Sequence, residues 1–337
     1  MVNFGKKVVK YRVLILILGV LLLIPSVFGY LNTRVNYDVL TYLPDNIETM
    51  KGQDILVNDF GTGAFSMFIV DGMEEKDVAK LKEKIEKVDH VANVIWYDSI
   101  SDISVPMSML PDDIYDVFNS DTGTMMAIFF DEGTSSDGTM DAIAQIRKIA
   151  GKQCFLSGMS AVVTDTKNLA EKETPVYVLI AVILAVIVLG LTMESFFVPL
   201  LFMLSIGMAI IYNLGSNYFM GEISYITKAL AAVLQLGVTM DYSIFLLDSF
   251  EENKKHYPDD RNLAMGHAIA ATFKSIIGSS ITTVAGFLAL CSMTFALGRD
   301  IGIVMSKGVI MGVICCVTFL PSIILVFDKA IEKTKPV

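Results

Sequence analysis

Histidine, cysteine and charge are all scarce in this sequence of 337 residues. Three histidines and four cysteines are present, and 18% of the residues are charged against 53% that are hydrophobic. Three of the cysteines fall in long apolar runs and only Cys154 does not, so no disulfide framework is expected. So apolar a composition over this length excludes an ordinary soluble domain and favours a membrane protein.

The scarcity of histidine and of membrane acids also argues against an enzyme. No histidine lies in an apolar run, so none could activate a serine there. An intramembrane aspartyl protease needs two acids on neighbouring spans, and Asp241 is the one acid placed centrally in a run. His90 has no cysteine or second histidine near it in the sequence, which predicts no metal site. We therefore expect neither enzymatic activity nor a metal or other cofactor.

Six apolar runs are each close to the ~20 residues that cross a bilayer. They lie at 11–30, 176–194, 196–217, 226–248, 275–296 and 303–327. The first has a basic start but no small-residue cleavage site, which favours an uncleaved helix over a signal peptide. Lysines and arginines gather before the first run, in the loop 251–274 and after the last run. The chain is therefore expected to be a multi-pass protein of the cell membrane. The positive-inside rule then predicts that both of its termini lie in the cytoplasm.

One long polar segment, residues 31–174, separates the first span from the five-helix domain of residues 175–337. It carries 25 acids and 12 bases, and eleven of the acids lie between Val88 and Ile146, where no lysine or arginine occurs. This stretch is typical of a solvated surface or of a field that attracts cations. Strand patterns at 64–71, 91–98, 123–131 and 153–157 enclose amphipathic helices at 74–88 and 138–150. That order predicts an extracytoplasmic α+β ferredoxin-like (split βαβ) domain, with both helices on one face of its sheet.

The carboxylate of Asp241 interrupts the fourth apolar run. An acid at the centre of a bilayer costs at least ~2.5–3.5 kcal/mol, so a function is expected to offset the cost. No lysine or arginine lies at that depth in any span, which suits a group that loads and unloads protons. The alternative is a hydrogen-bonded contact that only joins two helices. Hydroxyls of the fifth run that are expected at the same depth belong to Ser279, Ser280, Thr282 and Thr283.

The segment GVTMDYSIFLLDSFEE, followed by GSSITTVAGFLAL and LPSIIL, resembles the MmpL branch of the resistance–nodulation–division (RND) superfamily. The residues that carry the resemblance are Gly237, Asp241, Tyr242, Phe245, Glu251 and Glu252, with Thr239 as a polar neighbour. The resemblance covers nearly the whole chain. It implies a proton-driven exporter of lipids or other hydrophobic molecules, with Asp241 and Tyr242 as the proton relay. Glu251 and Glu252 form a cytoplasmic motif, and the outer domain resembles a porter domain that receives cargo.

Members of that branch usually contain two six-span halves, and this sequence contains one. We therefore expect a second half as partner, most simply another copy of the chain in a homodimer. Further expected partners are hydrophobic or lipid-like cargo and membrane lipids, whereas nucleic acid is not expected. Two alternatives stay open: a non-transporting membrane component, such as a sensor or a partner in a translocation complex, and an inactive half of a split exporter.

Overall fold

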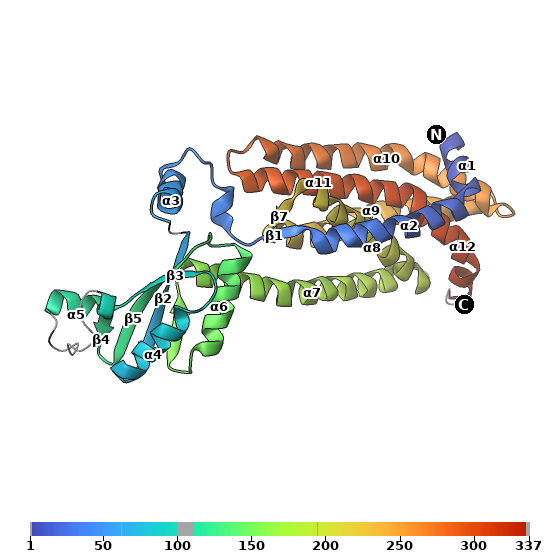
Figure 1. Cartoon of the computed structure of the whole chain (residues 1–337). Helices are drawn as coiled ribbons and strands as arrows, with labels where there is room; N and C mark the ends of the chain where they lie inside the picture. The colour runs from blue at the N-terminus through green and yellow to red at the C-terminus, as the bar shows by residue number, and fades with distance from the viewer. Residues whose placement is uncertain (1, 62, 100–108, 110, 194, 335–337) are drawn as a thin grey trace. The chain divides into compact units, whose positions relative to one another are not determined.

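The computed structural model describes residues 2–61, 63–99, 109, 111–193 and 195–334 (Figure 1). They form two compact units: Met1–Asn36 together with Lys172–Val337, and Tyr37–Glu171. Helix α7 (Met159–Thr192) begins in the second unit and ends in the first.

The first unit is built from long apolar helices. Six helical stretches among the described residues are long and apolar enough to cross a membrane: Arg12–Asn32, Met159–Thr192, Phe197–Met220, Tyr225–His256, Arg261–Ser292 and Ala296–Lys333. They contain α2 (Arg12–Asn32), α7, α8 (Phe197–Gly215), α9 (Tyr225–His256), α10 (Arg261–Ala289), α11 (Ala296–Ile314) and α12 (Leu320–Lys333). A π-helical turn, Cys315–Phe319, joins α11 to α12. The prediction of six spans is confirmed.

Glycines let several of these helices approach closely. A Cβ atom on Gly29 of α2 would collide with the carbonyl of Gly215 in α8. The short helix α1 (Val2–Lys10) meets α10 in the same way, with Gly5 against the carbonyl of Gly266. Small residues at such crossings allow the van der Waals packing on which helix association in membranes depends.

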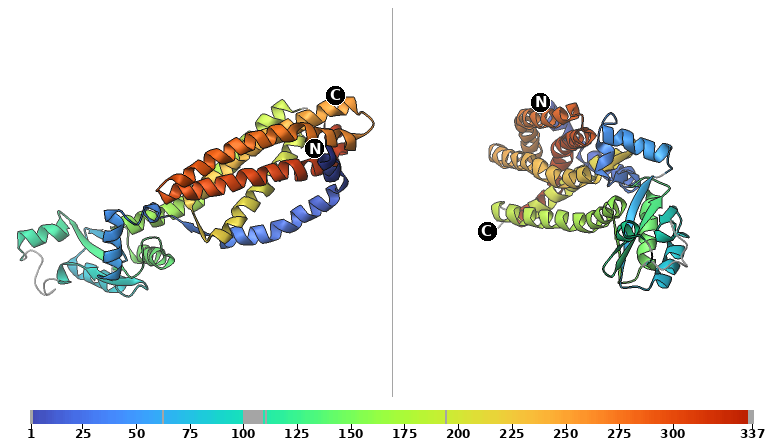
Figure 2. Two further views of the ribbon diagram at one scale, coloured as in Figure 1. Left: turned by 90° about the horizontal axis from the view of Figure 1, so that it is seen from above. Right: turned by 90° about the vertical axis from the view of Figure 1, so that its left-hand side faces the viewer.

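The two ends of the bundle differ in what they carry. Both termini, α1 and the turn between α9 and α10 lie at one end (Figures 1 and 2). At the other end β1 (Arg34–Asn36) pairs in parallel with β7 (Glu222–Ser224). With six spans the two termini must lie at the same end of the bundle, because each span carries the chain to the opposite end.

The second unit is a sheet with helices on one face. Its main elements are β2 (Ala64–Asp71), α4 (Glu75–Ile85), β3 (Val91–Ile95), β5 (Gly123–Phe130), α6 (Asp137–Ile149) and β6 (Cys154–Ser157). The strand order is β3-β5-β2-β6 with every pair antiparallel, and the short β4 (Asn119–Ser120) pairs in antiparallel fashion with the start of β5. The predicted strand 91–98 ends at Ile95 because a 3₁₀ turn, Tyr97–Ser99, follows it. Two further helices are α3 (Glu48–Asn58) and α5 (Asp112–Phe118).

Alternation along the strands decides which face of this sheet is buried. Phe68 of β2, Ile128 of β5 and Val94 of β3 join one hydrophobic cluster with Ile85 of α4 and Ile143 of α6. Both helices therefore cover the same face. Intervening side chains such as Phe65 point to the opposite face, because successive residues of a strand alternate.

Two phenylalanines of β2 test this assignment. Phe68 is fully buried and Phe65 is 46% exposed. Phe68→Ala should lower the free energy of unfolding of the unit by about 3–5 kcal/mol, since it leaves a cavity in the core. Phe65→Ala, the matched control, should cost less than about 1 kcal/mol. Urea unfolding of a fragment spanning residues 37–171, followed by the fluorescence of the buried Trp96, measures both. Equal losses for the two variants would contradict the assignment of the faces.

Candidate functional site

Helix α9 carries an acid, Asp241, whose side chain is exposed. Ser224 caps the start of α9, where its side chain accepts a hydrogen bond from the backbone N–H of Ile226. Gly237, Asp241 and Phe245 follow at intervals of four residues and share one exposed face. Apart from the backbone of α9 and the two neighbouring residues, no atom of the described residues lies within 4 Å of the place where a Cβ of Gly237 would be. Among the described residues, Asp241 has neither a hydrogen bond nor an ion pair.

The opposite face of α9 is polar and buried. Tyr242 is 3% exposed, and within the described part of the chain its hydroxyl oxygen has no hydrogen-bond partner. Thr239 lies against α11, where a Cβ on Gly312 would come within 2.5 Å of its hydroxyl oxygen. The sequence grouped Thr239 and Tyr242 with Asp241. The helical period of 3.6 residues turns them away from it, so the signature residues divide between an exposed face and a buried one.

Three of the four predicted hydroxyls of α10 form hydrogen bonds within their own helix. Thr282 and Thr283 both donate to the carbonyl of Ser279, at 2.7 and 3.0 Å, and Ser280 donates to Ile277 at 3.0 Å. None of the hydrogen bonds found in the described residues joins them to Asp241. Ser280 instead lines an apolar groove of about 480 Å³ between α10 and α11, together with Ile281, Val284 and Ile310.

A second membrane acid, Asp300, has the partners that Asp241 lacks. Its carboxylate accepts hydrogen bonds from the backbone N–H of Ser224 at 2.9 Å and from the hydroxyl of Thr227 at 2.5 Å. Nearby, Lys307 donates to Asn217 at 2.5 Å. Asp300 thus joins α11 to α9, which is the purely structural role considered for Asp241. For Asp241 itself that role would need a partner outside the described residues.

Buried amides continue this polar contact between α8, α9 and α11. Asn213 donates to Gln235 at 3.0 Å, and a Cβ on Gly308 would lie 2.6 Å from the Asn213 amide nitrogen. No role for Asn213 or Lys307 in this contact was predicted from the sequence. Both residues could have been noticed in the sequence, because an amide or a lysine inside an apolar run usually has a polar partner there.

The paired glutamates end α9. Glu251 forms an ion pair with Lys254 at 2.9 Å, and the carbonyl of Glu252 bonds with the ring of His256. At the same end of the bundle Arg261 pairs with Asp328 and, at 2.6 Å, with Glu332. The paired glutamates therefore lie in a charged region separate from the face that bears Asp241.

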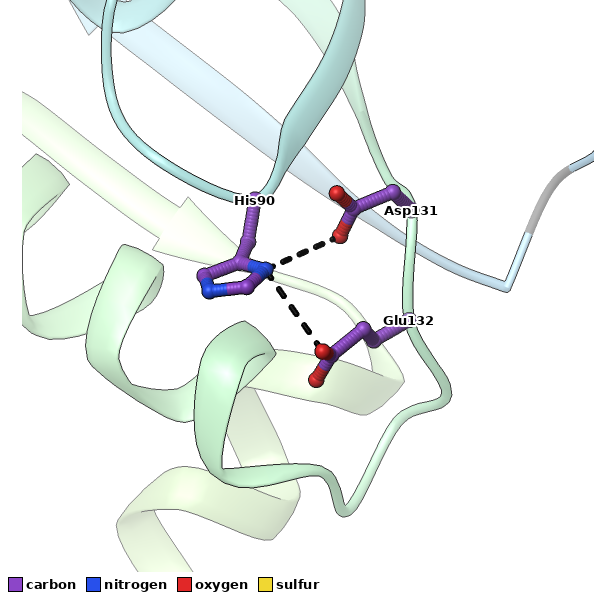
Figure 3. Close-up of side chains that lie close together, drawn as sticks. All are labelled: His90, Asp131 and Glu132. Atoms are coloured by element: carbon purple, nitrogen blue, oxygen red, sulfur yellow. Dashed lines mark hydrogen bonds and ion pairs between the residues drawn. The ribbon is translucent and has the colours of Figure 1, made fainter.

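His90 of the second unit is less isolated than its sequence neighbours suggest. Its Nδ1 lies 3.3 Å from a carboxylate oxygen of Asp131 and 3.6 Å from one of Glu132 (Figure 3). All three residues are exposed, and their ligand-type atoms lie within 4.8 Å of one another. They are the group among the described residues that could hold a metal ion. The sequence did not reveal it because pairing of β3 with β5, with Val91 opposite Phe130, brings the groups together.

Comparison with known proteins places the chain in a family. The ActII-3 membrane protein of Streptomyces coelicolor is 22% identical over 353 residues, which cover 96% of this chain and 46% of that protein. The protein MJ1562 of Methanocaldococcus jannaschii is 26% identical over 247 residues, covering 69% and 62%. A Mycobacterium tuberculosis protein named "Probable transport protein MmpL12" is 23% identical over 173 residues, covering 50% and 15%.

The chain spans less than two thirds of the length of each of these relatives. The model of the family described as "MMPL family" matches residues 61–336. This match confirms the resemblance seen in the signature residues of α9: the chain belongs to the MMPL family.

Proposed function

We propose that the chain is a six-span half of a proton-coupled exporter of lipids or other hydrophobic and amphiphilic molecules across the cytoplasmic membrane. Membership in the MMPL family and a relative named as a transport protein support a membrane transporter. The observation that carries the proposal is the exposed carboxyl of Asp241 within a predicted span, which has no hydrogen bond or ion pair among the described residues.

Asp241 is the proposed proton carrier. Apolar surroundings favour a neutral carboxyl group, and contact with water favours a charged one. A conformational change that moves the carboxyl group between lipid or protein and water would therefore make it bind and release a proton. Tyr242 is the proposed second member of the relay; its side chain faces the interior of the bundle, where its buried hydroxyl has no hydrogen-bond partner among the described residues. Replacing Asp241 with asparagine tests this role, because an amide keeps the shape of the acid but cannot carry its proton.

The exposed face of α9 is the proposed surface for pairing with a second half. Gly237 leaves open space on that face, so another helix can come close to Asp241. Paired halves of transporters are often related by an axis along the membrane normal, and two copies of one chain reproduce this as a two-fold axis.

The second unit is the proposed porter domain, with a ferredoxin-like fold. Its support is the antiparallel order β3-β5-β2-β6 with α4 and α6 in one core, which is the split βαβ arrangement. On the face that these helices leave open, Phe65, Ile69 and Phe155 are 46%, 36% and 57% exposed. Such an apolar surface suits hydrophobic cargo, as does the groove between α10 and α11.

The proposed topology places both termini in the cytoplasm and the second unit outside. In a variant without its native cysteines, a cysteine at Asp137 should react with a membrane-impermeant thiol reagent applied to intact cells. A cysteine at Lys255, near the end of α9, should react only after the membrane is opened. Both positions are exposed, so access to the reagent decides the result. The reverse labelling pattern would contradict the proposed orientation.

A further inference from the structure

A pocket lined by cationic side chains lies at the end of the bundle that carries both termini. It encloses about 440 Å³ between α1, the start of α2 and the start of α10. Lys6, Lys10 and Arg12 supply positive charge to its wall. The apolar part of the wall comes from Val9, Val13 and Leu263.

The charge in this pocket is unbalanced. None of the carboxylates in the described residues lies within 4 Å of the charged groups of Lys6, Lys10 or Arg12. The one acid of the wall, Asp260, already accepts a hydrogen bond from the backbone N–H of Leu263 at 2.9 Å, as the cap of α10. Three cations facing one engaged carboxylate leave a site that favours an anion.

The pocket is formed by elements that are fixed to one another. Gly5 of α1 packs against the backbone of Gly266, and the stem of Lys6 lies beside the same glycine. Arg12 donates a hydrogen bond of 2.6 Å to the side chain of Asn262. These contacts hold α1 and the start of α2 on α10, so the cations need not be assembled when a ligand arrives.

The position of the pocket selects the kind of anion. Arg12 is the first residue of the first span, so the pocket lies where the apolar helix meets the headgroup region. Val13, one residue further on, is 59% exposed and offers an apolar surface beside the cations. A phosphate that carries acyl chains satisfies both parts of the wall, whereas free phosphate satisfies only the cations. Basic pockets at the cytoplasmic ends of spans are known to suit such headgroups.

We propose that this pocket binds the phosphate headgroup of an anionic phospholipid, with Lys6, Lys10 and Arg12 as its ligands. The bound lipid stabilises the packing of α1 against α10 and is not the exported cargo. The site is therefore independent of the proposed transport function, and its test does not depend on transport.

Native mass spectrometry of the whole protein in detergent tests the proposal, with phosphatidylglycerol and phosphatidylcholine titrated separately. We expect the wild type to retain phosphatidylglycerol in preference to phosphatidylcholine. Each neutralised cation should weaken phosphatidylglycerol binding about fivefold, so Lys10→Gln/Arg12→Gln should weaken it about 25-fold. The single variant Lys10→Gln covers the case in which loss of the Arg12 hydrogen bond prevents folding.

Lys7→Gln/Lys255→Gln is the matched control, because it removes the same charge from exposed positions outside the pocket. It should leave phosphatidylglycerol binding within about twofold of the wild type. Equal weakening by the two double variants would overturn the proposal, since general charge attraction would then explain the binding. A second outcome would also overturn the proposal. If the wild type binds added inorganic phosphate, Lys10→Gln does not, and phosphatidylglycerol is not preferred over phosphatidylcholine, the pocket is a site for free phosphate.

Discussion

Asp241→Asn is expected to reduce proton-driven transport to the level of vesicles without protein, while expression and assembly stay unchanged. The acid makes no hydrogen bond or ion pair among the described residues, so its loss removes no contact that holds the bundle. Protein reconstituted into vesicles with an imposed pH gradient measures the effect. Transfer of a fluorescent phospholipid out of the vesicle membrane and the accompanying proton flux are recorded together.

Asp248→Asn provides the matched control, because Asp248 lies two turns further along α9 and is also exposed. It removes the same charge nearer the end of the span and should leave transport within about twofold of the wild type. Full transport by Asp241→Asn would contradict proton coupling through Asp241 and would leave only the purely structural role for this acid. Equal losses in both variants would show that the net charge of α9 matters rather than one proton site.

Gly237→Trp is expected to separate paired halves. An indole on the open face of α9 would hold a partner helix away from Asp241. No described residue outside α9 lies within 4 Å of the Gly237 Cβ position, so the chain itself has room for the indole. The affinity of pairing should fall at least about tenfold, or about 1.4 kcal/mol, and transport should fall with it. Mass photometry of the protein in nanodiscs at several concentrations measures the paired fraction.

Leu21→Trp is the control for adding a large side chain to an exposed face of a span outside α9. Leu21 is 58% exposed on α2, which packs on α8 and α12. Its substitution should leave the paired fraction unchanged. A wild-type protein that stays monomeric at high concentration and still transports would contradict pairing. Activity that appears only with a separately produced second half would change the identity of the partner and leave the surface as proposed.

The spans and the strands of the second unit could be predicted from the lengths and composition of apolar runs. Stretches of about 20 apolar residues identified the six helices, and β-branched and aromatic residues identified β2 and β5. The buried face of the sheet could not be predicted in this way, because β2 carries apolar side chains on both faces, such as Phe65 and Phe68. The extent of α10 could not be predicted in the same way, since its first residues are polar enough to read as a loop. The separate helix α1 was missed for the same reason, because it is short and basic.

The arrangement of the site could be predicted only in part. The period of α9 shows that Asp241 and Tyr242 face different directions, but it does not show which of them faces the rest of the bundle. That depends on how α8, α10 and α11 pack around α9, and the sequence of one helix does not contain it. The same limit applies to His90, whose carboxylate neighbours come from another strand through the register of the sheet.

Infrared difference spectroscopy of the protein in bilayers, recorded between alkaline and acidic pH, tests the central claim most directly. A protonated carboxyl group has its own stretching band. Subtracting the spectrum of Asp241→Asn from that of the wild type isolates the contribution of this one acid. We predict a band that grows as the pH falls and is absent from the variant. A carboxyl signal that is the same in both proteins at every pH would contradict proton coupling through Asp241.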